Sequence, residues 1–278
     1  MASAPSPQSL PEAPWKAEFL ANIKEMDSPE FVFSSLAPAP KGSTTEYLPR
    51  ARYCIYRSMW AELPENKHND APMNDRVYES DMPSFSSDVR MNKVFELFAS
   101  SAGKADDTSL TQGSGGGGPC EAVWWVKTDK TKVQWRIKGH AYVVGNDIED
   151  DQESSGVRTV KTELFSRMRV VKEEGKHDWS WSKELTGHFG NTSPGTRGTF
   201  KAPPPGQQVD KPYSKDLQPG QVKTLDDETA RTNFRVVVIK PDEVEKLDLS
   251  SSDPSESRRY VYTFNGQSGS WDMEECWP

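Results

Sequence analysis

The chain has 278 residues, of which 34% are hydrophobic and 27% charged, with a formal net charge of −8. This acidic balance argues against general nucleic-acid binding, which needs a dominant cationic surface to displace counterions from phosphates. Cys54, Cys120 and Cys276 lie far apart, with no C-x-x-C spacing and no histidines at ligand spacing. We therefore expect neither a disulfide framework nor a metal site.

The N-terminal region predicts a short tail followed by a helix. Residues 1–13 hold no apolar run flanked by basic residues, and no later segment reaches membrane-spanning length. We expect a disordered tail at 1–13, no membrane association and a cytoplasmic location. From Pro14 onward, Trp15, Phe19 and Ile23 share one face of a predicted packing helix.

Two β-compatible runs come next, at residues 31–36 and 52–57, and the proline- and glycine-containing segment between them predicts a hairpin. A helix is expected to begin near Asp88. Three segments are poor in apolar residues and cannot offset the entropy of being ordered. We expect these to be flexible insertions in a single domain: 103–119, 146–156 and 202–223.

Residues 121–144 predict a second hairpin, with its turn at 128–131. Its second strand alternates apolar residues with an amide and two cations: Val133, Trp135 and Ile137 against Gln134, Arg136 and Lys138. Gly139 indicates a bulge or the close approach of another backbone. An ordinary sheet with one solvated face would have this pattern. An ordered polar face could instead bind a ligand or a partner subunit.

The remaining sequence predicts one helix, an aromatic-rich packing segment and four strands. The helix lies near residues 160–168, the packing segment at 179–189, and the strands at 233–239, 244–249, 260–264 and 271–276. Strands outnumber helices and do not alternate with them. This favours a mainly β fold, a small antiparallel barrel with peripheral helices.

Residues 86–93 bring two hydroxyls and two cations to a strand–helix junction. Free N–H groups at a helix start favour an anion, and Arg90 and Lys93 share a helical face there. The alternative is that Asp88 is a simple N-cap and the cations are solvated. Arg52 and Arg57 end a short β run, where they either open toward a site or form rim charges.

Several motifs occur in a specific order. They are Arg52 with Arg57, Ser87-Asp88-x-Arg90-x-x-Lys93, Gln134-Trp135-Arg136-Ile137-x-Gly139, Trp181 with Leu185, Arg197 and Phe200, and Pro203-x-Pro205-Gly206. This order resembles the pyridoxamine 5′-phosphate oxidase-like FMN-binding split-barrel family. The resemblance implies a six-stranded antiparallel split barrel over residues 14–278. It also implies a homodimer with FMN in the groove between two barrels.

The resemblance assigns cofactor contacts by position. The implied FMN contacts are Arg52 and Arg57 beside the flavin and its phosphate, Ser86, Ser87, Arg90 and Lys93 at the phosphate, Gln134 from the hairpin, and Arg259 near the isoalloxazine.

The chain also departs from this pattern. Met91 stands where the family usually has serine, and Leu247 where the authentic oxidases carry a tryptophan near the flavin. Ser255-Glu256-Ser257-Arg258-Arg259 replaces their substrate-binding Arg-Leu-His-Asp-Arg. The groups that bind pyridoxamine 5′-phosphate are thus missing. The resemblance therefore supports FMN binding by this chain more strongly than it supports the oxidation of pyridoxamine 5′-phosphate.

We therefore expect an FMN-dependent oxidoreductase with an unknown substrate. The flavin carries such chemistry, which agrees with the absence of a convincing catalytic triad. The four histidines are scattered, and His140 is the one near the expected pocket. One alternative is a non-catalytic FMN-binding sensor or carrier. Another is an acidic scaffold whose insertions recruit partners and which ignores FMN.

Overall fold

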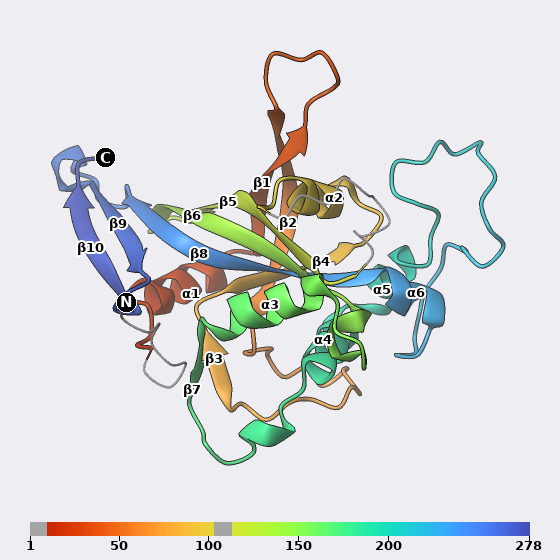
Figure 1. Ribbon diagram of the computed structural model, residues 1–278. Coiled ribbons are helices and arrows are strands. Elements are labelled where there is room, and N and C mark those ends of the chain that lie inside the picture. Colours follow the sequence, from red (N-terminus) through yellow and green to blue (C-terminus); the bar gives the residue numbers. More distant parts are fainter. Residues whose placement is uncertain (1–9, 103–112) are drawn as a thin grey trace.

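The computed structural model describes residues 10–102 and 113–278, and its centre is a closed ring of antiparallel strands (Figure 1). In the order of their pairing, the six strands of the ring are β8 (Phe234–Asp248), β4 (Pro83–Asp88), β2 (Tyr47–Met59), β1 (Glu30–Pro38), β5 (Gly115–Lys127) and β6 (Lys132–Val144). β6 pairs back to β8 and closes the ring. The predicted mainly β fold and both predicted hairpins are confirmed.

Strand β8 differs from the sequence prediction, which placed two strands at 233–239 and 244–249. The structure has one strand that pairs with β6 along its length, with β4 near its start and with β9 (Arg258–Asn265) near its end. Pro241 interrupts the pattern but not the strand, because it lies opposite Gly139 at a bulge where Asp242 of β8 has no register partner in β6. A proline has no N–H to donate, and a bulge tolerates that loss.

Gly139 confirms the predicted close approach of another backbone. A Cβ atom there would lie 2.0 Å from the carbonyl oxygen of Lys240. Beyond β8, the ring extends into an open two-strand arm, β9 and β10 (Ser270–Cys276), seen at the left of Figure 1.

The interior of the ring is an aromatic core closed by α1 (Lys16–Lys24). Phe19 of α1 packs edge-on against Trp124 and Trp135, and Phe31 stacks on Trp124 with ring centroids 4.4 Å apart. The indole N–H of Trp135 donates to Asn22 Oδ1 at 2.8 Å. The predicted stripe of α1 is therefore a core-packing face.

A second apolar layer covers the outer face of β4 and β8. It includes α3 (Ser155–Phe165), α4 (Trp181–Asn191), α5 (Pro194–Thr199), α6 (Glu228–Asn233) and a two-strand sheet of β3 (Tyr78–Ser80) and β7 (Met168–Val170). Trp60, Trp181, Phe189 and Phe234 are buried in it. The fold thus has two cores on opposite faces of shared strands.

Two of the expected flexible insertions are partly ordered. Residues 115–119 form the start of β5 and pair with β6, because their glycines allow α2 (Asn92–Ala99) to approach. A Cβ at Gly118 would lie 2.2 Å from Ser100 Oγ. In the 146–156 insertion, Asn146–Glu149 form a 3₁₀ turn that buries Ile148, and α3 begins at Ser155. The 202–223 segment is an irregular loop at the right of Figure 1, and residues 103–112 lie outside the described residues.

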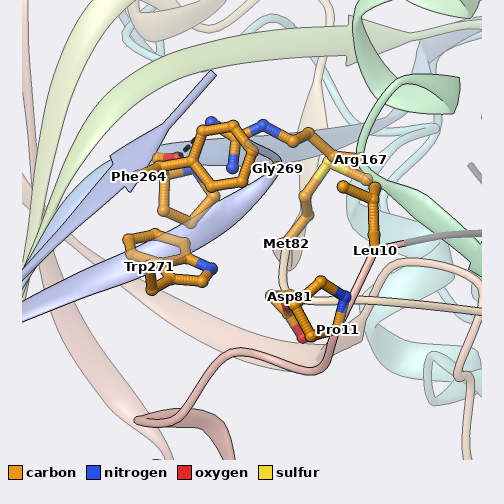
Figure 2. A pocket seen from close by; sticks show the side chains of 9 residues that line it. Leu10, Pro11, Asp81, Met82, Arg167, Phe264, Gly269 and Trp271 are labelled. Atoms are coloured by element: carbon orange, nitrogen blue, oxygen red, sulfur yellow. Dashed lines mark hydrogen bonds between the residues drawn. The ribbon is translucent and has the colours of Figure 1, made fainter. Parts of the chain in front are cut away.

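The end of the predicted N-terminal tail is also ordered, whereas residues 1–9 lie outside the described part. Ala13 is buried and its N–H donates to Asp81 Oδ2 at 3.0 Å. Figure 2 shows Leu10 beside Met82 and Pro11 beside Asp81. The Arg167 guanidinium lies 3.1 Å from the centre of the Phe264 ring. The cavity that they enclose is about 10 Å³, which holds one water at most. It is therefore no ligand site.

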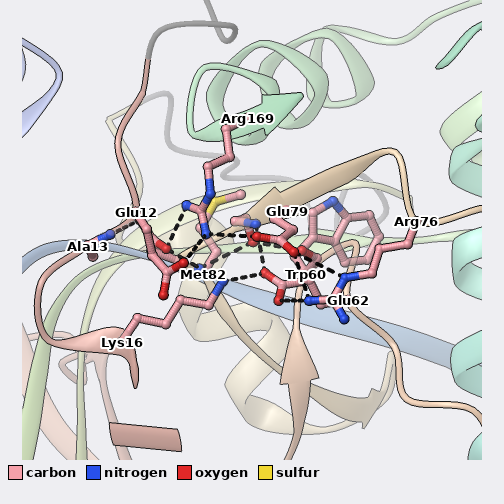
Figure 3. A network of polar contacts seen from close by, with 11 residues as sticks. Glu12, Ala13, Lys16, Trp60, Glu62, Arg76, Glu79, Met82 and Arg169 are labelled. Atoms are coloured by element: carbon pink, nitrogen blue, oxygen red, sulfur yellow. Dashed lines mark hydrogen bonds and ion pairs between the residues drawn. The ribbon is translucent and has the colours of Figure 1, made fainter. Parts of the chain in front are cut away.

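A largely buried ion-pair network fixes α1 to the second layer (Figure 3). The Lys16 ammonium lies 2.6 Å from Glu62, and Arg169 lies 2.8 Å from Asp81. Glu62 also accepts from the backbone N–H of Ser80. Within residues 10–102 and 113–278, no helix has the length and apolar character needed to cross a membrane.

We predict that Gly139→Ala lowers the free energy of unfolding by about 1–3 kcal/mol, because the new methyl group meets the Lys240 carbonyl in a tightly packed ladder. Urea unfolding monitored by tryptophan fluorescence measures the change. Gly266→Ala is the matched control, since a Cβ there meets no atom within 4 Å. Equal losses in the two variants would contradict the tight contact between β6 and β8.

Candidate functional site

The start of α2 offers unsatisfied backbone donors. β4 ends at Asp88, and Met91 in extended conformation precedes the helix without a side-chain cap. The first N–H groups of a helix have no partner within it, and they carry the positive end of the helix dipole. This end of α2 can therefore receive an anion.

Lys93 places a buried cation at the same point. The residue is 8% exposed, and its ammonium donates to Ser87 Oγ at 3.3 Å and lies 2.8 Å from Met91 Sδ. Within the described residues, no carboxylate forms an ion pair with it. Burial lowers the pKa of Lys93, and the nearby charge of Arg52 adds to that effect, while the charges of Asp88 and Glu96 oppose it. A buried ammonium without a counterion is costly, so this position favours an anionic ligand.

Arg52 lies close to Lys93, but its charge is already paired. Its guanidinium donates to Ser35 Oγ at 2.5 Å and to Glu96 Oε2 at 2.6 Å. Ser35 also donates to Glu96 at 2.5 Å. These contacts fix α2 to β1 and β2 and offset the charge of Arg52, whereas Lys93 has no ion-pair partner among the described residues.

Arg90 is bound by protein acceptors in this structure. Its Nε and Nη2 donate to the two carboxylate oxygens of Asp88 at 2.8 and 2.6 Å. Nη1 donates to the carbonyl of Ala202 at 2.9 Å, and Nη2 also approaches that of Phe200. The arginine therefore links the end of β4 to the segment after α5. Its role as a phosphate ligand stays a prediction.

Arg57 and Ser86 lie away from Lys93 and border the second layer. Successive residues of a strand point to opposite faces, so Ser86 faces away from Ser87. The Ser86 hydroxyl and Arg57 Nε are buried and have no hydrogen-bond partner. Arg57 lines a cleft with His188 of α4.

Gln134 and Arg259 lie together on a third part of the sheet. Both pair with Leu247 of β8, so the three residues form one row across β6, β8 and β9. Arg259 forms an ion pair with Glu245. Figure 1 shows β9 well separated from α2. Among the described residues of one copy, no hydrogen bond or ion pair joins this row to Lys93.

Comparison with known proteins separates most of the predicted FMN contacts from Arg259. Residues 12–145 match the family model for the pyridoxamine 5′-phosphate oxidase, FMN-binding domain. This part of the chain is similar to that family. It contains every predicted FMN contact except Arg259.

The fold of the whole chain is similar to that of a solved family protein. A pyridoxamine 5′-phosphate oxidase-related, FMN binding protein from Nostoc punctiforme matches 97% of this chain and 100% of its own, with a TM-score of 0.55 and 14% sequence identity. PhzG from Burkholderia lata, solved with tetrahydrophenazine-1-carboxylic acid, matches over 96% and 94% at a TM-score of 0.44 and 14% identity. No curated protein matches the chain. The chain therefore has a pyridoxamine 5′-phosphate oxidase-like fold.

A buried Glu–His pair on α4 was missed by sequence reasoning, which treated the histidines as scattered. His188 is 1% exposed and stacks on Trp60 with ring centroids 5.7 Å apart. Its Nε2 lies 3.7 Å from Glu184 Oε1, and neither ring nitrogen has a hydrogen-bond partner. The spacing Glu-x-x-x-His within one helix was the available signal.

The environment drives the two pKa values apart. Burial raises the pKa of Glu184 to about 7, although Asn74 and the Ala61 N–H donate to its carboxylate. Burial, with the adjacent charge of Arg57, lowers the pKa of His188 to about 3. At neutral pH the imidazole is therefore neutral and Glu184 is partly protonated. Ala61 is the one non-glycine residue with positive φ in the described chain, at 66°, so the backbone is strained beside this pair.

We predict that Arg90→Ala lowers the free energy of unfolding by about 3 kcal/mol, because it leaves the buried Asp88 carboxylate unpaired. Urea denaturation measures this loss, and limited proteolysis should show faster cleavage in residues 200–223. The exposed Arg158 supplies the control variant, Arg158→Ala. A stability within about 0.5 kcal/mol of wild type would rule out the linking role of Arg90.

We predict that Glu184→Gln raises stability relative to wild type as the pH increases. The folded-state pKa of Glu184 is raised from 4.5 to about 7, so its stabilising contribution is complete below pH 4.5 and is lost as the pH rises through 7. The difference in unfolding free energy should grow by up to about 3 kcal/mol between pH 5 and pH 8. The contribution of His188 to stability has the opposite pH dependence, but it cancels in the comparison because His188 is present in both wild type and Glu184→Gln. Glu65→Gln, at an exposed carboxylate, should show no such trend; an equal trend there would contradict the assignment.

Proposed function

We propose that this protein binds FMN and uses it as a flavin-dependent oxidoreductase. The observation that carries the proposal is the buried Lys93 ammonium, which has no carboxylate partner and lies at the uncapped start of α2. A phosphate group accepts from an ammonium, a hydroxyl and backbone N–H groups together. Lys93, Ser87 and the first turn of α2 supply that set of donors.

The sequence of the phosphate site fits this assignment with one change. Met91 occupies the position where the family usually has a serine, and its sulfur contacts the Lys93 ammonium. A thioether accepts only weakly, so it holds the lysine in place without neutralising it. The cation remains available for a phosphate.

We also propose that the FMN site is completed by a second copy of the chain. Gln134 and Arg259 share their sheet face with Ile55 and Trp125, which are 39% and 46% exposed. Tyr53, on the same face of β2, is 75% exposed. Large apolar side chains exposed among polar groups on one sheet face are typical of a protein interface. A partner covering it supplies Gln134 and Arg259 to a flavin held by Lys93.

Bound FMN supplies hydride or electron transfer, which the side chains themselves do not provide. The chain's own residues hold the phosphate and shield the ring, and the substrate differs from pyridoxamine 5′-phosphate. The segment from Ser255 to Arg259 supports that difference, because Ser257 takes the place of the histidine that the authentic oxidases carry.

We predict that Lys93→Met weakens FMN binding at least tenfold without unfolding the protein, because it removes the phosphate's buried counterion and keeps the length of the side chain. Quenching of FMN fluorescence during titration gives the affinity, and circular dichroism checks the fold. Lys24→Met, at an exposed lysine, should bind FMN as wild type does. Wild-type affinity in Lys93→Met would show that the phosphate lies elsewhere.

The absorbance spectrum of the purified protein, with mass identification of any released ligand, tests the cofactor itself. Reduction of the bound flavin by NAD(P)H, followed by oxygen uptake, is the result expected of the oxidoreductase. A flavin that these donors leave oxidised would favour a sensor or carrier. A colourless monomer that ignores added FMN would overturn the proposal.

A further inference from the structure

A cleft of about 310 Å³ lies between β2 and α4, on the side of the sheet that faces the second layer. Its lining includes Arg57 from β2, Leu63, Pro64 and Asn66 from the following loop, and His188 and Asn191 from α4. We call it the His188 cleft. Its volume is at the small end of the range for ligand cavities.

The walls of the His188 cleft are held by hydrogen bonds that do not involve a ligand. Asn191 Nδ2 donates to the carbonyl of Pro64 at 2.9 Å, and Asn69 Nδ2 donates to Asn191 Oδ1 at 2.7 Å. Asn69 also donates to the carbonyl of Gly187 at 3.0 Å. The loop after β2 is thereby fixed to α4, so the cleft is formed before a ligand arrives.

Arg57 brings an uncompensated cation to this cleft. Among residues 10–102 and 113–278, no side chain forms an ion pair or a hydrogen bond with its guanidinium, and its Nε is buried without a partner. Burial lowers its pKa. Glu65 lines the same cleft but forms no ion pair with it. Guanidinium groups that are desolvated in this way pair with carboxylates and phosphates.

His188 adds a neutral polar group behind the cation. The ring is held in one orientation by its stack on Trp60, and both nitrogens are buried without a partner. A neutral imidazole both donates and accepts one hydrogen bond. A buried polar group without a partner costs about 1–3 kcal/mol, so the pairing of two such groups at one cleft points to a ligand that satisfies both.

We propose that the His188 cleft binds a small monocarboxylate. Arg57 binds the carboxylate, His188 contacts a second polar group such as a hydroxyl, and the apolar body of the ligand lies against Leu63 and Pro64. Arg57 is the one cation of the lining and forms no ion pair with Glu65, so it matches a single negative charge. A phosphate dianion would remain half-compensated here.

The ligand is the substrate of the proposed oxidoreductase, because Arg57 is also a predicted flavin contact. This step rests on the proposed function, whereas binding in the cleft does not. The two can therefore fail separately.

Calorimetric titration of the full-length protein with the hydroxybenzoate isomers tests the proposal, with the matching hydroxybenzamides as neutral analogues. At least one acid should bind, and its amide should bind at least tenfold more weakly. Arg57→Met should weaken binding of the acid at least tenfold and leave the amide unchanged. Arg158→Met, at an exposed arginine of α3, is the matched control and should bind as wild type does.

His188→Phe separates a binding role from a structural one. Phenylalanine keeps the stack on Trp60 and removes both unpartnered nitrogens, so the melting temperature should stay equal to that of wild type or rise. Affinity for the hydroxylated acid should fall several-fold. A lower melting temperature with unchanged affinity would show that His188 is structural.

The proposal is overturned if no acid binds, if acid and amide bind equally, or if Arg57→Met leaves the affinity unchanged. Repeating the titration with FMN present tests the link to the flavin, since a substrate beside it should shift the flavin absorbance. Acid binding in a protein that ignores FMN would end the proposed function and leave the cleft assignment intact.

Discussion

The fold depends on the pairing of β8 with three neighbours. Val236 and Val238 face the second layer, whereas Val237 and Ile239 face the ring interior, and all four are fully buried. A strand buried on both faces shows a continuous apolar run rather than alternation. A slip of one residue would exchange its two faces, so both cores specify a single register.

This arrangement places the two candidate sites on different faces of the same strands. Ser87 of β4 faces Lys93 at the start of α2, and Ser86 faces the second layer. Arg52 and Arg57 divide in the same way on β2, since Arg52 binds Glu96 of α2 and Arg57 lines the His188 cleft. A single layer of strands therefore separates the proposed phosphate site at Lys93 from the proposed carboxylate site in the His188 cleft.

Local patterns in the sequence predicted the elements that depend on local physics. The hairpin of β5 and β6 follows from alternation, and α1 follows from its aromatic stripe. The ordered glycines of β5 could not be predicted this way, because their role is to admit α2 from elsewhere in the chain. The Asp88 contact of Arg90 spans two residues, but its contacts with the carbonyls of Phe200 and Ala202 span more than a hundred. The sequence could propose the FMN contacts only as one set. Which of them share a face of the sheet depends on how the strands pair, and the sequence does not show that pairing.

Buried polar atoms without a partner occur in both cores, but the ionisable ones gather mainly around α4. Trp15 and Trp124 in the ring interior and Trp60 in the second layer leave indole N–H groups without acceptors, whereas Arg57, Glu184 and His188 have unpartnered atoms beside α4. Burying an ionisable group without a partner costs more than burying an indole N–H. Apolar side chains at these positions would make the second layer more stable. Proteins commonly give up stability in this way at functional sites. The second layer is therefore better explained as one wall of a binding cleft than as packing alone.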